Sequence, residues 1–162
     1  MDKPTDADFT ALPIDKALAI GTYGEAVAAY RYLVLSEKAL SEEDRRILAE
    51  LADEEQDHKL RLRDLLTKLF PESAFVLTDR DKEMVVVGPR LLDVHDAESF
   101  ADAMRMLLFS ERKTAKFYAK LGKYIDQDKL RALFRELAEE DVGHCERLKQ
   151  LAEKDGIPSD ER

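Results

Sequence analysis

Apolar residues recur at steps of three and four through four long stretches of the chain, at about 13–39, 41–70, 97–125 and 127–154. This spacing puts the apolar side chains on one face of a helix and therefore predicts four amphipathic helices. Between the second and third stretches, residues 71–96 hold two prolines, a glycine and the run Val85–Val87, which break the helical period. We expect a long connection there, with Val85–Val87 as a short extended piece.

The residues at the two short gaps predict tight turns. Ser41 opens the sequence SEED, where its hydroxyl can accept a free backbone N–H of the second helix, and Asp126 can cap the fourth helix in the same way. The first two helices therefore form one antiparallel hairpin, and the last two form another. Residues 71–96 can run the length of a bundle, so we expect a ferritin-like arrangement of the hairpins with two parallel neighbouring helices.

The predicted fold class is all-α, as a single domain over residues 1–162 with a four-helix bundle at about 13–154 and loosely held ends at 1–11 and 155–162. The chain is 38% charged and 44% hydrophobic, with few glycines and prolines, as helical bundles are. Its length suits one buried core.

The charge and the cysteine content limit the binding partners and the cellular compartment that we expect for this chain. A net charge of -9 without a basic patch disfavours nucleic acid and membrane surfaces. No stretch approaches the roughly 20 apolar residues that span a bilayer. The single cysteine, Cys145, fits a reducing compartment. We expect a cytoplasmic protein.

Acidic residues and histidines interrupt the apolar stripe of every predicted helix. The six interrupting residues are Glu25 on the first helix, Glu55 and His58 on the second, Glu111 on the third, and Asp141 and His144 on the fourth. The acidic residue of the second helix follows that of the first by 30 residues, and the same spacing recurs in the second hairpin. Since both helices of a hairpin rise equally per residue, the spacing brings all four carboxylates to one height.

Four buried carboxylates need a counter-charge, because burying an unpaired anion is costly and two imidazoles cannot neutralise four of them. Two divalent cations balance them, and mixed carboxylate and imidazole ligation suits iron or manganese. Known dimetal bundles use one Glu from each of two helices and Glu-x-x-His from the other two. The alternative is a polar layer that fixes the register of the helices, or histidines that are satisfied by neighbouring carboxylates. Glu54 and Glu140, one position off the stripes, are predicted to be solvated flanking residues and reserve ligands.

Over about residues 14–154, the chain resembles the rubrerythrin-like branch of the ferritin-like superfamily. The segments that carry the resemblance are GEAVAAYRYL, DEEQDH, SERKTAKFYAKL and EEDVGH. The resemblance implies two bound iron ions, with manganese or a mixed pair as alternatives. The roles that it implies are terminal ligands at Glu25 and Glu111, bridging ligands at Glu55 and Asp141, and one imidazole for each metal from His58 and His144. Tyr32 and Tyr118 resemble tyrosines that donate hydrogen bonds to the bridging carboxylates, and the alternative is that they are plain core tyrosines.

Three departures from the family pattern are visible. Asp141 stands where relatives usually have glutamate, and its shorter side chain predicts an asymmetric site. Thr114 occupies the position where rubrerythrins typically carry an extra glutamate. The chain also lacks their cysteine-ligated iron domain, so any reductant must come from another protein. Cys145 is expected to be a small packed side chain, and His95 a surface or capping residue.

The resemblance implies a non-haem di-iron oxidoreductase that reduces peroxide or dioxygen, or oxidises ferrous iron, with an external electron-donor protein. The alternatives are a metal-binding or iron-handling module without turnover and a dimanganese catalase-like enzyme. From Ala17 to Leu35 the first helix carries only two charged residues, Glu25 and Arg31, so its outer surface is apolar. Either a second copy in a homodimer or the crossover must cover that surface.

Overall fold

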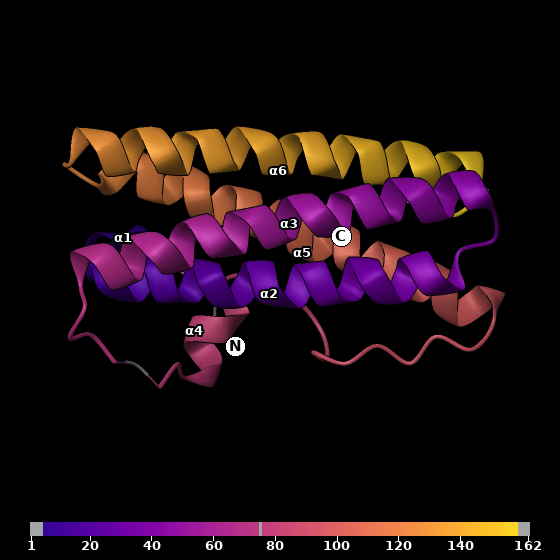
Figure 1. Cartoon of the computed structure of the whole chain (residues 1–162), viewed down its shortest axis with the longest axis horizontal. Helices are drawn as coiled ribbons and strands as arrows, with labels where there is room; N and C mark the ends of the chain where they lie inside the picture. Colours follow the sequence, from indigo (N-terminus) through magenta and orange to yellow (C-terminus); the bar gives the residue numbers. More distant parts are fainter. Residues whose placement is uncertain (1–4, 75, 159–162) are drawn as a thin grey trace.

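Four long helices form a bundle in the structure, a computed structural model that describes residues 5–74 and 76–158. They are α2 (Ile14–Lys38), α3 (Glu42–Leu69), α5 (Ala97–Tyr124) and α6 (Asp128–Lys154), and two short helices, α1 (Asp6–Thr10) and α4 (Asp79–Glu83), lie outside the bundle (Figure 1). The described residues contain no strand. The all-α prediction is confirmed, and each long helix begins and ends within one residue of its predicted bounds. None of the described helices is long and apolar enough to span a membrane.

The two hairpin turns form differently. The Ser41 hydroxyl accepts from the backbone N–H of Asp44 at 3.1 Å, as predicted for the start of α3. The predicted cap at Asp126 is wrong, because α6 begins after Gln127, which makes no side-chain cap. Instead, Arg131 donates to the carbonyl oxygens of Ile125 and Asp126 at 3.1 and 2.9 Å, and this guanidinium ties the turn together.

The hairpins pack so that all neighbouring long helices run antiparallel. Helix α2 lies beside α3 and α5, and α6 lies beside α5 and α3. The expected parallel neighbours are therefore wrong, since the parallel pairs lie on the diagonals of the bundle. The reason is the path of the crossover, which returns along α2 for the length of the bundle (Figure 1) and delivers α5 beside α2 rather than α3.

Buried contacts fix the crossover to α2 and α5. Val85 is buried against Gly24, where an added Cβ would lie 2.9 Å from the valine side chain. Arg31 is fully buried and donates to the carbonyl oxygens of Val87 at 2.9 Å and Pro89 at 2.7 Å, and to Ser110 Oγ at 2.9 Å. Val85–Val87 forms a turn and coil after α4, so the expected extended piece is not a strand.

The described parts of both chain ends are held more firmly than expected. Phe9 on α1 is buried, and its ring centroid lies 5.9 Å from that of Phe117. Ile157, beyond α6, is also buried and joins the core. Apolar burial of this size stabilises a segment by about 1.5–3 kcal/mol per side chain. Residues 1–4 and 159–162 lie outside the described residues.

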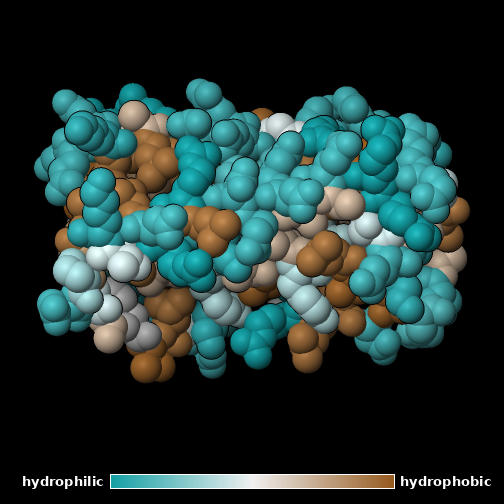
Figure 2. Space-filling view, viewed as in Figure 1, coloured by the Kyte–Doolittle hydropathy of each residue, from teal (hydrophilic) through white to brown (hydrophobic). Residues whose placement is uncertain are grey.

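The crossover covers only part of the apolar surface of α2. Ile20 and Val27 belong to one buried cluster with Val85. Tyr30 and Leu33 stay exposed, at 38% and 52%. The face in Figure 2 is mostly hydrophilic, and hydrophobic side chains reach the surface in separate patches, some of them where α2 and the crossover lie. The crossover therefore covers one side of α2, as one of the two alternatives expected, and leaves Tyr30 and Leu33 on the surface.

Candidate metal centre

The six polar residues of the helix stripes meet in the middle of the bundle, between two apolar clusters that fill its two ends. Each is at most 5% exposed. Their ligand atoms form two groups, and within each group the atoms lie within 4.8 Å of one another. The groups are Glu25, Glu55, His58 and Asp141, and Glu55, Glu111, Asp141 and His144. Glu55 and Asp141 belong to both groups, as a carboxylate that bridges two metal ions must.

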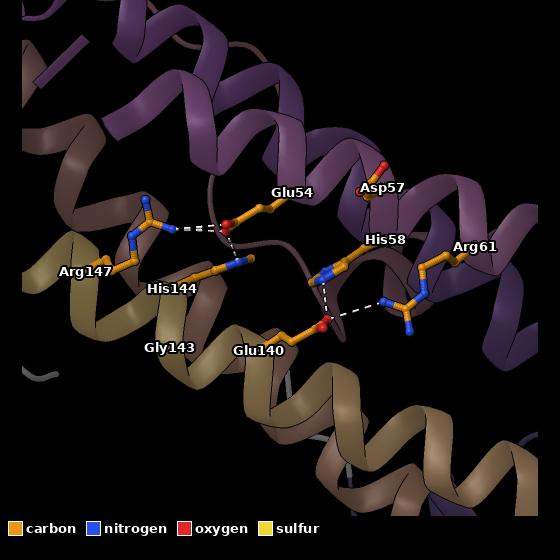
Figure 3. A pocket seen from close by; sticks show the side chains of 8 residues that line it. All are labelled: Glu54, Asp57, His58, Arg61, Glu140, Gly143, His144 and Arg147. Atoms are coloured by element: carbon orange, nitrogen blue, oxygen red, sulfur yellow. Dashed lines mark hydrogen bonds and ion pairs between the residues drawn. The ribbon is translucent and has the colours of Figure 1, made fainter. Parts of the chain in front are cut away.

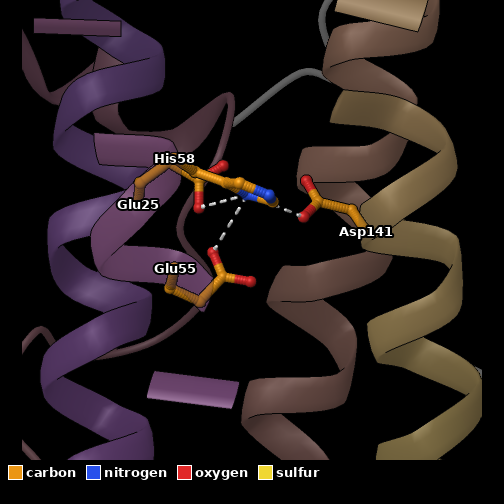
Figure 4. A group of neighbouring side chains, drawn as sticks. All are labelled: Glu25, Glu55, His58 and Asp141. Carbon is orange, nitrogen blue, oxygen red and sulfur yellow. Dashed lines mark ion pairs between the residues drawn. The ribbon is translucent and has the colours of Figure 1, made fainter. Parts of the chain in front are cut away.

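Three carboxylates converge on one nitrogen in the first group (Figure 4). His58 Nδ1 lies 3.5 Å from Glu25 Oε2, 3.9 Å from Glu55 Oε2 and 3.7 Å from Asp141 Oδ1. The i, i+3 spacing on α3 places Glu55 and His58 on the same helical face, and Glu25 comes from the antiparallel partner at the same height. The three oxygens and the nitrogen therefore surround one position.

The second group repeats this arrangement from the other hairpin. His144 Nδ1 contacts Glu55 Oε1 and lies 3.6 Å from Glu111 Oε2 and 3.5 Å from Asp141 Oδ1. The donors are again three carboxylates and one imidazole, which suits iron, manganese or zinc among the common metals. Two equivalent positions therefore lie side by side in the bundle.

A carboxylate from the opposite hairpin holds the outer nitrogen of each imidazole (Figure 3). His58 Nε2 lies 2.6 Å from Glu140 Oε2, and His144 Nε2 lies 2.8 Å from Glu54 Oε2. Such a partner holds a ring proton on Nε2, which leaves Nδ1 as the nitrogen that could bind a metal ion.

These two glutamates correct the expectation of solvated flanking residues. Their side chains are 47% and 38% exposed, but one oxygen of each is committed to an imidazole. Arg147 pairs with Glu54 at 3.2 Å, and Arg61 pairs with Glu140 at 3.5 Å. The sequence does contain a signal for them, because both glutamates and both arginines recur at the same 86-residue offset as the predicted ligands.

The two tyrosines are not equivalent. Tyr118 donates to Glu25 Oε1 at 2.7 Å, so it supports a predicted terminal ligand rather than a bridging one. The buried hydroxyl of Tyr32 has no hydrogen-bond partner among the described residues. Tyr118 therefore fixes Glu25, whereas Tyr32 does not fix Glu111, although each tyrosine follows the glutamate of its own helix by seven residues.

The donor atoms themselves fit metal binding. Atoms from four of the six side chains are buried without a hydrogen-bond partner, and they are Glu25 Oε2, His58 Nδ1, Glu111 Oε2 and both Asp141 carboxylate oxygens. The buried Glu55 Oε1 and His144 Nδ1 contact each other. A buried polar atom left unpaired costs about 1–3 kcal/mol, and more if it is charged. Two divalent cations would satisfy these atoms and their charge together.

Burial and mutual repulsion explain the proton affinity of this cluster. Burial, with the neighbouring charges of Glu111 and Glu25, raises the pKa of Glu55 well above its usual range. Burial and the same two glutamates raise the pKa of Asp141 well above its usual range. Burial lowers the pKa of His58, but its contacts with Glu25 and Glu140 outweigh this effect and raise it overall. Without cations the cluster therefore retains protons, which metal ions must displace.

Three further residues have roles away from the donor groups. Thr114 Oγ1 donates to Val85 O at 3.1 Å and Ser110 O at 2.9 Å, so it helps to fix the crossover. Cys145 is partly buried against an apolar cluster, and burial raises the pKa of its thiol to about 12, which makes it the packed side chain that we expected. His95 is an exposed surface residue.

The fold and the donor set define a class: four-helix bundles with a buried cluster of carboxylates and histidines that can hold metal. Residues 16–152 match the model of the rubrerythrin family, and the chain belongs to that family. A solved structure of a hypothetical protein from Pyrococcus furiosus is 25% identical, with a TM-score of 0.77. The alignment covers 94% of this chain and 95% of that one. No curated protein matches the chain.

Proposed function

We propose that the six stripe residues bind two iron ions and that the protein is a non-haem di-iron oxidoreductase of the rubrerythrin type. The observation that carries the proposal is the pair of buried donor groups that share Glu55 and Asp141. Membership of the rubrerythrin family supports it. A polar layer that only sets helix register would pair its own donors and acceptors, whereas here Glu25 Oε2, Glu111 Oε2 and both Asp141 carboxylate oxygens are buried without a hydrogen bond.

Each residue of the centre has a distinct task in this proposal. Glu55 and Asp141 lie between the two positions and would bridge them, and the shorter reach of Asp141 makes the pair asymmetric. Glu25, held by Tyr118, and Glu111 would each complete one position. The imidazoles would bind through Nδ1. Because the surrounding side chains exclude bulk water, the interactions within this centre are electrostatically strong.

Bound iron would supply Lewis acidity and the capacity to exchange two electrons with peroxide or dioxygen. The chain contributes geometry and proton retention, since burial and the neighbouring carboxylates raise the pKa of both Glu55 and Asp141. The substrates of this proposal are peroxide, dioxygen or ferrous iron, and the electrons come from an external donor protein.

The test begins with elemental analysis of protein produced without added metal. Protein loaded with two ferrous ions per chain is then mixed with peroxide, with and without a chemical reductant. Oxidation of both ions, followed by turnover with the reductant, supports the proposal. A single oxidation without turnover supports an iron-handling module, and bound manganese with peroxide disproportionation supports a catalase-like enzyme. Cys145→Ser is the control variant, and protein that binds no metal contradicts all three functions.

We also propose that two copies associate through the second apolar stripe of α2, formed by Ala19, Tyr23, Ala26, Tyr30 and Leu33. Three of the five are half-buried and the last two exposed. The five side chains carry no charge, and the nearby Lys82 Nζ lies 5.5 Å from the centroid of the Tyr23 ring, so the contact would contain no acidic side chain from the stripe itself. The cytoplasmic location stays a prediction.

A further inference from the structure

The two faces of the candidate centre are covered in different ways. On the side of α2 and α5, the crossover lies directly over the centre. Val85 is 1% exposed and packs against Gly24, the neighbour of the predicted ligand Glu25. Thr114, one turn after Glu111, donates to Val85 O. Tight side-chain packing and buried hydrogen bonds therefore close this face to an ion from solvent.

The face between α3 and α6 is hollowed instead. A pocket of about 330 Å³ lies there (Figure 3), and of the six predicted ligands only His58 and His144 line it. The two rings are nearly parallel, with centroids 5.5 Å apart and planes inclined by 16°. Their Nε2 atoms contact the pocket glutamates, and their Nδ1 atoms face the buried carboxylates. The imidazole pair is thus the wall between the pocket and the centre.

The groups that hold this wall are themselves weakly held. Glu54 and Glu140 line the pocket, and their arginine partners, Arg147 and Arg61, are 36% and 39% exposed. Half-exposed ion pairs contribute only about 0–1 kcal/mol, so a glutamate can leave its arginine at little cost. A divalent cation in the pocket would meet a free carboxylate oxygen next to an imidazole, and these are the ligand types of the centre itself.

We propose that the pocket between α3 and α6 is the route by which divalent metal ions enter the centre. Glu54 and Glu140 are positioning residues on this route, which hold the imidazole wall in place and receive the incoming cation. This inference rests on the proposed function in one respect only, that the centre binds metal.

Gly143 offers a direct way to obstruct the route. It lines the pocket, and a Cβ added to it would meet no atom within 4 Å, so a larger side chain can enter the pocket without a clash at its base. In the internal repeat Gly143 corresponds to Asp57, which lines the other end of the pocket. Val142, the adjacent residue on α6, is 60% exposed and does not line the pocket. It provides a control position for the same aromatic substitution.

The experiment compares metal loading of wild type, Gly143→Ala, Gly143→Leu, Gly143→Phe and Val142→Phe. Each protein is stripped with a chelator and mixed with cobalt(II), and the absorbance of the bound ion is followed in time. Loading of Gly143→Phe is expected to slow about tenfold or more, a barrier increase of about 1.4 kcal/mol. The loading rate of Gly143→Leu is expected to lie between those of Gly143→Phe and wild type. The loading rates of Gly143→Ala and Val142→Phe are expected to stay within about twofold of wild type.

Final occupancy and thermal unfolding accompany the rates. Equal occupancy in all five proteins and stability no lower than that of wild type, with the slow rate confined to the larger residues at position 143, support the route. Wild-type loading rates in Gly143→Leu and Gly143→Phe overturn it. If Gly143→Phe unfolds, Gly143→Leu alone decides between these outcomes. A wild-type protein that binds no cobalt, iron or manganese contradicts the proposed metal centre itself.

Discussion

Glu140 on α6 and His58 on α3 lie 2.6 Å apart between Oε2 and Nε2, which joins the second hairpin to an imidazole of the first. The reciprocal contact of Glu54 with His144 joins the first hairpin to the second. Each candidate metal position therefore depends on a side chain that stands outside its own donor group. This exchange couples the assembly of the bundle to the orientation of both imidazoles.

Replacing Glu140 by alanine is expected to lower metal affinity about 10–100-fold, the usual cost of removing a carboxylate that orients a histidine ligand. Glu140→Gln keeps an acceptor oxygen for Nε2, so its metal affinity should fall less than that of Glu140→Ala. Competition with a chromogenic chelator measures the affinities. Glu139→Gln, at the exposed neighbour, is the control, and wild-type affinity in Glu140→Ala would show that the contact does not position the ring.

Removing the shared ligand Glu55 separates metal binding from folding. Glu55→Gln is expected to reduce bound metal from two ions per chain to one or none, because both donor groups lose the negative charge of the carboxylate that they share and one of them loses its oxygen. The same change should stabilise the metal-free protein at pH 8, since it relieves the repulsion that raises the pKa of Glu55. Elemental analysis and thermal unfolding measure the two effects. Full occupancy in this variant would mean that Glu55 is not a ligand.

The C-cap of α6 provides a pH-dependent test away from the centre. Burial and the neighbouring Asp44 carboxylate raise the pKa of Asp155 to about 6. A group whose pKa is raised by folding stabilises the protein below its unfolded pKa, here 3.8, and this contribution is lost as pH rises through about 6. Asp155→Asn should therefore raise the melting temperature at pH 7.5 by a few degrees, about 1 kcal/mol after solvent screening.

At pH 3.5 the same substitution should have a much smaller effect on the melting temperature, because the aspartate is then protonated in the folded state and mostly protonated in the unfolded state. Glu153→Gln, an exposed neighbour on α6, is the control and should show no such change between the two pH values. Equal melting temperatures of Asp155→Asn and wild type at pH 7.5 would contradict the shifted pKa.

Arg31 is expected to be required for the attachment of the crossover. Arg31→Ala removes a buried cation that donates to Val87 O, Pro89 O and Ser110 Oγ, and should destabilise the protein by about 2–4 kcal/mol. Limited proteolysis should then cut near residues 84–90 before it cuts the bundle. Exposed Lys116→Ala is the control, and unchanged cleavage in the arginine variant would show that other contacts hold this segment.

The second apolar stripe of α2 predicts a homodimer. Light scattering at micromolar protein is expected to give about 37 kDa, twice the chain mass of 18.5 kDa. Leu33→Asp places a charge on the stripe and should give the monomer mass, whereas Leu91→Asp, at an exposed crossover position, should not. A wild-type monomer at all concentrations would show that the crossover is the only cover that α2 needs.

The helical period determined the four long helices and the six residues that meet between them. Both follow from local rules: apolar spacing fixes which face of a helix is buried, and equal rise per residue fixes which residues of a hairpin share a height. Glu25 and Glu55 could be placed together for this reason. The 86-residue repeat then related the second hairpin to the first.

Only the tertiary structure decided how the hairpins face each other. The antiparallel packing of α2 on α5 depends on the path of the crossover, which is held by the fit of Val85 against Gly24 and by the hydrogen bonds of Arg31 to main-chain carbonyls. The pairing of Glu140 with His58 follows from that packing. Such contacts join residues far apart in the chain, where period and propensity carry no information, because they depend on the shapes of surfaces that exist only after the helices have packed.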